Sequence, residues 1–305
     1  MSLPMAMSGE PFAWYGGCWQ PSGAIMLRLT DIGVLQGVVL VERLRTCNSR
    51  LLDVDAHLDR LWAGCRALGI QIPEHLDLRG IVAECVPRNL SAFGSQDFSI
   101  VVLVTPGEPE TPPYPTMIVH PQAIDWNLLA NWYQHGQILG FSAHRSIPAE
   151  CWSPQIKTRS RLNYFLADSQ VKERFGATAN ALMQDHTGGL TETSNANLLI
   201  VEGRTIVSAP QENILQGVSL ARTMRLADKL GYETRYEPIS VSRAHAADEM
   251  LLCGTTGCFW PVSKLDDHNY PSVNGECYRQ VSAQWKADVE FDYVAQAIDI
   301  AQFAS

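Results

Sequence analysis

The sequence predicts a mixed fold of the α/β or α+β class in two domains, and two observations carry the prediction. Segments rich in β-branched residues alternate along the whole chain with segments whose apolar residues recur at helical spacing. The 305 residues also suffice for two domains of ordinary size, each with its own core. We place the domains at 1–122 and 138–305, with 123–137 as the connection between them.

The first half is expected to contain one long helix between strands. Leu58, Leu61 and Cys65 fall at helical spacing, and Asp55 is the expected N-cap of that helix. The prolines of 106–115 require a loop, because proline cannot donate a backbone hydrogen bond. Strands are expected where β-branched and apolar residues lie between turn residues, over 23–31, 98–105 and 115–120.

The second half continues the alternation. Helices are expected over 161–175 and over 217–232, where Leu220, Met224 and Leu230 share one face. Strands are expected over 181–184, over 197–210 as a pair joined around Gly203, and over 248–254.

Composition and charge argue against several classes of function. The formal net charge of −9 disfavours a nucleic-acid partner, whose phosphates attract basic patches. The longest apolar run is too short to span a bilayer, and the first basic residue, Arg28, comes too late for a secretory signal. The eight cysteines form no CxxC pair, so we expect free thiols in a reducing cytoplasm and no metal site.

The compact motifs of common enzyme classes are absent from the sequence. It contains no GxGxxG, GxxxxGK[ST], HExxH or GxSxG. The sequence therefore does not support a dinucleotide-binding fold, a P-loop, a zinc protease or the nucleophile elbow of a hydrolase. The chemistry must therefore come from residues that lie far apart in the sequence.

Lys157 is the first residue of interest. The chain uses arginine for every fixed positive charge before it, and only four lysines follow it. A guanidinium stays protonated at working pH, whereas a lysine amine in a partly desolvated site can lose its proton and act as nucleophile and base. No other charge lies within 155–158, which suits such a lowered pKa. An exposed lysine without a special role is the alternative interpretation.

Four further stretches indicate one ligand when they are considered together. Ser219 opens a predicted helix whose free N–H groups suit a phosphate. The hydroxyls of Thr255 and Thr256 and the guanidinium of Arg60 would complete that phosphate site. Glu192, after a Gly-Gly turn, can keep a pyridine nitrogen protonated. Each residue alone is also explained as a helix cap, a turn or a solvated charge. A phosphate, a pyridine nitrogen and an aldehyde that a lysine can attack together describe pyridoxal 5′-phosphate (PLP).

With these residues in place, the sequence resembles the class IV aminotransferases, the branched-chain and D-amino-acid aminotransferase family of PLP enzymes. The resemblance covers about residues 23–285. It rests on "DIGVLQGVVLVERLRTCNSRLLDVDAHLDRL", with Gly37 and Glu42, and on "IKTRSRLNYFLA", "GGLTETSNANLLIV", "QGVSLA" and "DEMLLCGTTG". Each piece alone is weak, and their order and separations make the signal specific.

The resemblance implies a role for each matching residue. Lys157 matches the lysine that forms a Schiff base with the cofactor and moves the substrate proton, and Glu192 matches the glutamate that faces the pyridine nitrogen. Asn197 is expected to play a supporting role near the ring. Tyr164 is the nearest match to a tyrosine on the cofactor hydroxyl, although it lies further along the chain from the lysine than is typical. The other cofactor-binding residues are expected at the phosphate: Arg60, Val218, Ser219, Thr255 and Thr256.

Substrate contacts are less typical of the family. Arg45 lies where branched-chain and aminodeoxychorismate enzymes often carry arginine, so it either contacts a substrate carboxylate or is a charge at a strand edge. Val41 replaces the usual aromatic residue of the substrate pocket. Arg159 and Arg161 either bind an acidic substrate or lie on the surface. Pro106 follows the strand after which the D-amino-acid branch keeps an arginine, which argues against that branch.

The resemblance also implies a two-domain fold with the cofactor between the domains, and a homodimer in which a partner loop closes the site. Three functions stay open. The preferred one is a cytoplasmic aminotransferase that moves an amino group from an amino acid of branched-chain type to a 2-oxo acid. The second is a 4-amino-4-deoxychorismate lyase that gives 4-aminobenzoate and pyruvate, and the third a non-catalytic relative that keeps the cofactor. The expected partners are small amino and 2-oxo acids, with neither nucleic acid nor membrane.

Overall fold

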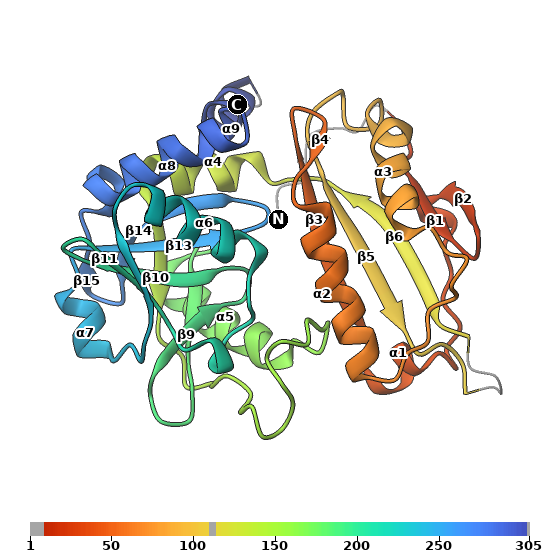
Figure 1. The fold of residues 1–305 in the computed structure, drawn as a ribbon, viewed down its shortest axis with the longest axis horizontal. Coiled ribbons are helices and arrows are strands. Elements are labelled where there is room, and N and C mark those ends of the chain that lie inside the picture. Colours follow the sequence, from red (N-terminus) through yellow and green to blue (C-terminus); the bar gives the residue numbers. More distant parts are fainter. Residues whose placement is uncertain (1–8, 110–113, 304–305) are drawn as a thin grey trace. The chain divides into compact units, whose positions relative to one another are not determined.

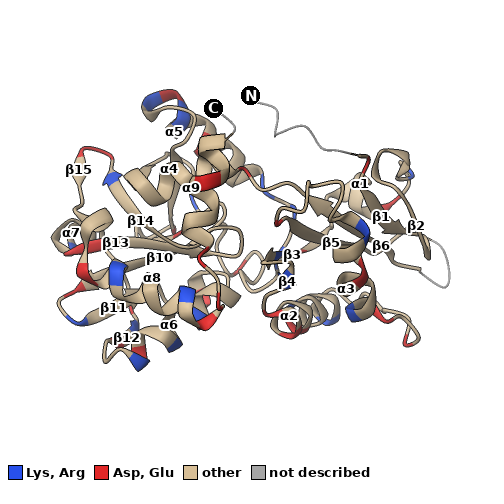
Figure 2. Ribbon diagram, turned by 90° about the horizontal axis from the view of Figure 1, so that it is seen from above, with Lys and Arg blue, Asp and Glu red and all other residues tan. Residues whose placement is uncertain are grey.

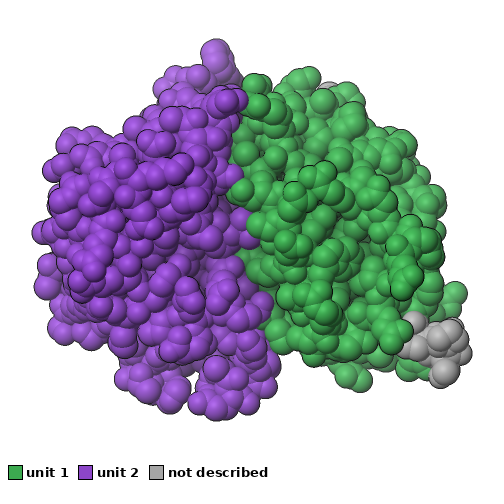
Figure 3. Space-filling model, in the orientation of Figure 1, with its two compact units in different colours: residues 1–125, 156–160 green, residues 126–155, 161–305 purple. Residues whose placement is uncertain are grey.

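The computed structural model describes residues 9–109 and 114–303, and the chain divides into two compact units (Figure 1). Unit 1 comprises Met1–Asp125 with Ile156–Ser160, and unit 2 comprises Trp126–Gln155 with Arg161–Ser305 (Figure 3). This division differs from the expected one at the stretch around Lys157. We expected that stretch in the second domain, whereas its contacts group Ile156–Ser160 with unit 1.

Unit 1 is an antiparallel sheet with helices packed on it. Its elements are β1 Phe12–Tyr15, β2 Cys18–Pro21, η1 Ser22–Ala24, α1 Ile32–Gln36, β3 Leu40–Cys47, β4 Arg50–Leu51, α2 Val54–Ala67, α3 Leu78–Asn89, β5 Ser99–Thr105 and β6 Thr116–Gln122. The strands stand in the order β2-β1-β6-β5-β3-β4. Helix α2 packs on β3, and α3 packs on β1 and β6 (Figure 1). Alternate strand residues such as Leu44 and Ile100 meet helix residues such as Leu58 in the core.

Most predictions for unit 1 are confirmed. Strands β5 and β6 and helix α2 lie where they were expected. The strand over 23–31 is wrong: the segment begins with η1 and ends in a turn in which Asp31 N donates to Arg28 O. Its apolar residues lack the alternation of a half-buried strand, and Met26 is 81% exposed. Asp55 is not the N-cap. That position belongs to Asp53, and the Asp55 carboxylate instead accepts a hydrogen bond from Arg79.

Unit 2 is a mixed sheet with helices packed around it. Its elements are α4 Trp126–His135, β7 Gln137–Gly140, α5 Leu162–Phe175, β8 Asn180–Gln184, β9 Leu190–Thr193, β10 Asn197–Glu202, β11 Thr205–Ser208, η2 Gln211–Asn213, α6 Val218–Lys229, β12 Glu233–Tyr236, α7 Val241–Ala246, β13 Glu249–Gly254, β14 Cys258–Leu265, β15 His268–Asn269, η3 Ser272–Asn274, α8 Glu276–Asp288 and α9 Tyr293–Phe303. The strands stand in the order β12-β11-β10-β13-β14-β7-β8-β9, and β15 pairs with β14. Strand β9 also pairs with β10, so the path of strands closes on itself.

The helices of unit 2 pack on these strands and on one another. Helix α5 packs on β8, α6 packs on β13 and α8, and α4 packs on α9 and β14. Helices α5 and α6 and strands β8, β10, β11 and β13 confirm the predictions for this half. Helix α4 occupies most of the segment 123–137 that we expected to connect the domains.

The net charge of −9 is not confined to one face of helices α2 and α3 (Figure 2). Acidic and basic residues are mixed along α2 and α3 (Figure 2). Over residues 9–109 and 114–303, no helix is long and apolar enough to cross a bilayer. Within the same ranges, no group of three or more His, Cys, Asp and Glu side chains is placed to hold a metal ion.

Candidate active site

The candidate site in unit 2 centres on the carboxylate of Glu192. Glu192 lies in β9 opposite Asn197 of β10, because a tight turn joins these two strands. Its Oε1 accepts a hydrogen bond from the Tyr164 hydroxyl at 2.8 Å. Its Oε2 accepts from Asn197 Nδ2 and from Leu215 N, both at 3.1 Å. These three neutral donors orient the carboxylate without themselves cancelling its charge.

Tyr164 reaches Glu192 from the first turn of α5. Arg161, which precedes the helix, donates to Ser194 O and holds its guanidinium 4.6 Å from the centre of the Tyr164 ring. Burial, the charge of Glu192 and the hydrogen bond to it raise the pKa of Tyr164 well above its usual value. The hydroxyl therefore stays protonated and donates a hydrogen bond to Glu192. From the sequence, Arg161 was expected either to bind an acidic substrate or to lie on the surface. The residue is half-buried and contacts Ser194 O and the Tyr164 ring.

The N-terminus of α6 lies next to this carboxylate. Asn197 Nδ2 also donates to Leu215 O at 2.9 Å, which fixes the chain just before the helix. A Cβ atom on Gly217 would lie 2.1 Å from Asn197 Oδ1, so a larger residue there would displace the side chain that supports Glu192. No described side chain caps α6, and the first-turn N–H groups, at Val218 and the buried Ser219, suit an anion.

The threonine pair lies at the same end of the sheet. Strand β13 pairs with β10 alongside Asn197, and Thr255 and Thr256 follow directly after β13. The two turns approach closely, since a Cβ atom on Gly254 would lie 2.6 Å from Asn195 O. Both threonines are half-buried. This end of the sheet therefore combines an oriented carboxylate, hydroxyl groups and a helix N-terminus.

Lys157 belongs to unit 1, in a segment that runs along the start of β3. Val41 N donates to Lys157 O at 3.0 Å, and Arg159 N donates to Val39 O at 2.8 Å. Ile156 packs against the core of unit 1, and Lys157 itself is half-buried. The backbone of the candidate nucleophile is thereby fixed next to Val41, the residue expected in the substrate pocket.

Arg60 lies in a buried cluster on α2 and β3. Its Nε donates to Glu42 Oε1 at 2.7 Å and its Nη2 to Glu42 Oε2 at 2.8 Å. His57 Nδ1 lies 2.8 Å from the same Oε2. Glu42 and His57 were given no role from the sequence, although a signal was present. His57 and Arg60 lie three residues apart on one face of α2, which packs on the strand that carries Glu42.

Arg45 is fully buried in β3, opposite Ser99 of β5. Its Nε donates to Thr46 O at 3.1 Å. Burial of this side chain is incompatible with a solvated charge at a strand edge, and contact with a substrate carboxylate stays a prediction.

The predicted residues fall into two groups, one in each unit. Unit 2 brings together Tyr164, Glu192, Asn197, Val218, Ser219, Thr255 and Thr256. Unit 1 holds Val41, Arg45, Arg60 and Lys157. Three residues that sequence reasoning missed take part in these contacts: Leu215, Glu42 and His57.

Comparison with known proteins gives one family and several relatives. Residues 39–265 match the family described as amino-transferase class IV. Over 274 residues, the chain is 27% identical to branched-chain-amino-acid aminotransferase-like protein 1 of Arabidopsis thaliana, an alignment that covers 87% of this chain and 48% of that protein. The chain thus spans about half the length of that curated relative.

Two solved structures share the fold. An aminotransferase from Brucella abortus, bound to the cofactor PLP, matches with a TM-score of 0.79 and 18% identity over 92% of this chain and 99% of that one. The 4-amino-4-deoxychorismate lyase from Pseudomonas aeruginosa matches with a TM-score of 0.73 and 26% identity over 92% of this chain and 100% of that one. These matches confirm the predicted fold class.

Proposed function

The chain belongs to the class IV aminotransferases, and we propose that it transfers an amino group from an amino acid of branched-chain type to a 2-oxo acid with PLP as its cofactor. The observation that carries the proposal is the carboxylate of Glu192, which three neutral donors orient next to the uncapped start of α6. A solved aminotransferase of this fold binds PLP, and the name of the curated relative refers to branched-chain amino acids.

The residues present fit this cofactor. Glu192 offers an oriented carboxylate to a protonated pyridine nitrogen, with Asn197 and Tyr164 as its supports. The start of α6, at Val218 and Ser219, offers N–H and hydroxyl donors to a phosphate. Other groups proposed for the same phosphate are Thr255, Thr256 and Arg60, whose guanidinium Glu42 orients.

The proposed mechanism divides the work among these side chains. When bound, PLP supplies an aldehyde and an electron-withdrawing ring that acidifies the Cα hydrogen of the amino acid. Lys157 holds the cofactor through its amine and, once released, takes the Cα proton as a general base. Glu192 keeps the proton on the ring nitrogen. Arg45 and Val41 are the proposed substrate contacts, Arg45 for a carboxylate and Val41 for an apolar side chain.

Chemical trapping tests the role of Lys157. Borohydride treatment of the yellow protein should attach the cofactor permanently to the peptide that contains Lys157, as measured by mass spectrometry of a digest. The Lys157→Ala variant should lose turnover while weak cofactor binding survives, and Lys172→Ala, which alters the next lysine in the chain, should keep both properties. Attachment of the cofactor to a different lysine would overturn the proposed mechanism.

A lyase is the second candidate, and one observation favours it. The P. aeruginosa 4-amino-4-deoxychorismate lyase aligns along its whole length at 26% identity. Pyruvate release from 4-amino-4-deoxychorismate, set against amino transfer from leucine to 2-oxoglutarate, separates the two activities. Turnover in neither assay by a protein that binds PLP would favour a non-catalytic relative.

We further propose a homodimer in the cytoplasm. Large apolar side chains are exposed in both units, among them Met26 at 81% and Leu29 at 80% in unit 1, and Leu162 at 71% and Phe165 at 68% in unit 2. Where such side chains form one contiguous patch, they mark a surface that binds another chain. The eight cysteines are free thiols, as suits a reducing compartment. Light scattering after size exclusion tests the dimer, and cell fractionation tests the location.

A further inference from the structure

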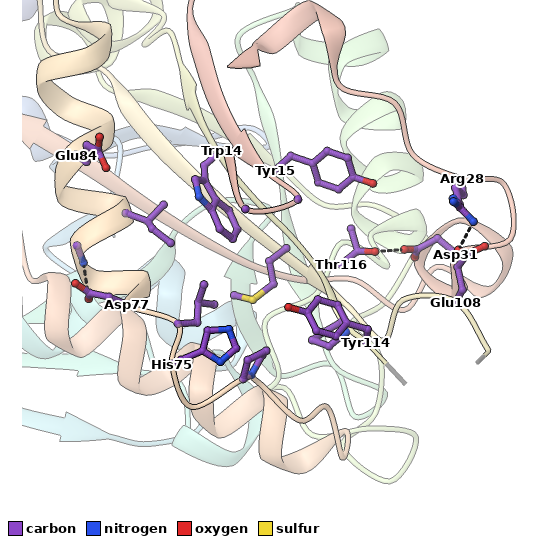
Figure 4. Close-up of a pocket in the computed structure, with 18 residues that line it drawn as sticks. Trp14, Tyr15, Arg28, Asp31, His75, Asp77, Glu84, Glu108, Tyr114 and Thr116 are labelled. Carbon is purple, nitrogen blue, oxygen red and sulfur yellow. Dashed lines mark hydrogen bonds and ion pairs between the residues drawn. The ribbon is translucent and has the colours of Figure 1, made fainter. Parts of the chain in front are cut away.

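A hollow lies within unit 1, and none of the residues proposed for the cofactor is among its described lining (Figure 4). It has a volume of about 820 Å³, within the size range of pockets that hold small molecules. Its walls come from the β1–β2 hairpin, from the loop before α3 and the first turns of that helix, and from the segments on either side of 110–113. All of the described residues that line it belong to unit 1.

Aromatic and apolar side chains form much of the lining. Trp14 and Tyr15 enter from β1, and Tyr114 enters from the segment before β6 (Figure 4). Ile81 and Met117 add aliphatic surface. These side chains suit a ligand with an apolar or aromatic body, and the faces of the aromatic rings attract a cation.

The charged groups of the lining are mainly acidic. Its carboxylates outnumber its Lys and Arg side chains four to one. The arginine, Arg28, is already paired with Glu108 at 2.8 Å. Asp31 is occupied as well, since Oδ1 accepts from Gly33 N at 2.7 Å and Oδ2 from Thr116 Oγ1 at 2.6 Å. The pocket therefore disfavours an anion and provides carboxylates for a cation.

The wall formed by α3 supplies the acidic groups with which a cation would interact. Asp77, Gly80, Ile81 and Glu84 lie on one face of the helix at spacings of three and four residues. Asp77 is the N-cap, with Oδ1 accepting from Gly80 N at 2.8 Å, and Glu84 forms an exposed pair with Arg88. Figure 4 shows Asp77 and Glu84 on one side of the hollow and the Arg28–Glu108 pair on the other.

We propose that this hollow binds an organic cation, an alkylammonium group that carries an apolar or aromatic body. The ammonium group interacts with the α3 wall and the aromatic faces, and the body packs against Ile81 and Met117. Carboxylate ligands, which include the amino and 2-oxo acids of the proposed reaction, are disfavoured by the acidic lining. The proposal is independent of the proposed function, because it uses no residue of the cofactor site.

Titration calorimetry of the full-length, PLP-loaded protein with benzyltrimethylammonium tests the proposal. A quaternary nitrogen carries no hydrogen and cannot condense with an aldehyde, so this probe does not report on the cofactor. We expect saturable binding of one cation per chain. The oppositely charged 3-phenylpropionate should bind at least about 10-fold more weakly. Absence of saturable binding by the cation, or equal binding of both probes, would overturn the proposal.

Substitutions of lining residues test whether the cation binds in this hollow. Tyr114→Leu should leave folding intact, because Tyr114 is 70% exposed. It should weaken binding roughly 2- to 10-fold through loss of a cation–π contact. Asp77→Asn keeps a helix-capping side chain and removes its charge, and should weaken binding about 3-fold. Glu84→Gln should act in the same direction.

Matched controls come from unit 2. Glu233→Gln removes an exposed carboxylate that is paired with Arg235, much as Glu84 is paired with Arg88. Tyr236→Leu removes a partly exposed tyrosine from β12. Both should leave the affinity for benzyltrimethylammonium unchanged. If the controls weaken binding as much as Tyr114→Leu and Asp77→Asn do, or if those two variants change nothing, the cation does not occupy this hollow.

Discussion

Glu42 in unit 1 and Glu192 in unit 2 are both held by several hydrogen bonds, but their donors differ. Glu42 is fully buried, and Arg60 donates to both of its oxygens while His57 lies against one of them. Glu192 is half-buried and accepts from a hydroxyl, an amide and a backbone N–H. Arg60 supplies a cation to Glu42, whereas these three donors to Glu192 are neutral.

This difference indicates that Glu42 stabilises the fold through an ion pair, whereas Glu192 can interact with a bound ligand. Burial raises the pKa of Glu42, but the hydrogen bonds from Arg60 and His57, together with their charges, outweigh burial and lower the pKa to about 2. The charge of Glu42 is thus balanced inside unit 1. The neutral donors on Glu192 fix its orientation, so that its carboxylate can face the cationic ring of a bound cofactor. The contrast therefore gives opposite expectations for the two residues, one for stability and one for turnover.

Removal of the Glu42 carboxylate should have the largest effect on stability. Glu42→Ala leaves the guanidinium of Arg60 in a buried site without its carboxylate, which costs about 3–5 kcal/mol. Urea unfolding followed by circular dichroism measures the loss. Glu84→Gln, which breaks an exposed glutamate–arginine pair in the same unit, should cost far less, because water screens an exposed pair. Equal losses in the two variants would show that the buried cluster contributes no more than a surface pair.

Acid should weaken the Glu42 cluster in a defined pH window. The pKa of Glu42 is lowered from 4.5 to about 2 in the folded chain, so its contribution to stability is complete above pH 4.5 and is lost as the pH falls towards 2. The difference corresponds to roughly 3 kcal/mol. Unfolding free energies measured at several pH values between 6 and 3 test this. Glu42→Gln should flatten the dependence, and an unchanged slope would contradict the assignment.

The sequence predicts local structure better than it predicts these clusters. Helices α5 and α6 and strands β5 and β6 follow from short-range periodicity, because each buries one regular face. The segment 23–31 misled the prediction, because three of its large apolar residues, Met26, Leu27 and Leu29, are exposed. Proposed dimer contacts would account for apolar residues at that position, and such contacts leave no periodic signal within one chain.

Contacts between residues far apart in the sequence explain which features of the candidate site could not be predicted. The family motif indicated Lys157, Glu192 and Arg60 individually. The backbone bond between Val41 and Lys157 joins two segments that lie more than a hundred residues apart in the sequence. No short-range pattern could predict it. The partners of Glu192 come from α5, β10 and the segment before α6, and only the fold brings them together.

Glu192→Gln should reduce turnover far more than stability. The amide keeps the shape of the side chain but lacks the charge that holds a proton on the ring nitrogen, so we expect kcat to fall about 100-fold and stability to fall by about 1 kcal/mol. Steady-state kinetics and urea unfolding separate the two effects. Glu249→Gln is the matched control, since Glu249 is also held by neutral donors, Cys277 N and Tyr278 N. It should lose stability and keep turnover.

Tyr164→Phe should have the smallest effect and shows how much one neutral donor contributes. The variant loses the 2.8 Å bond to Glu192, while Asn197 and Leu215 N still hold the other carboxylate oxygen. We expect a loss of about 1 kcal/mol in stability and a fall in kcat of about 10-fold. Tyr270→Phe removes a buried tyrosine bond to Ala244 O in the same unit, so it should match the loss of stability at unchanged kcat. If both variants slowed turnover equally, the bond from Tyr164 would act through general stability and not through the orientation of Glu192.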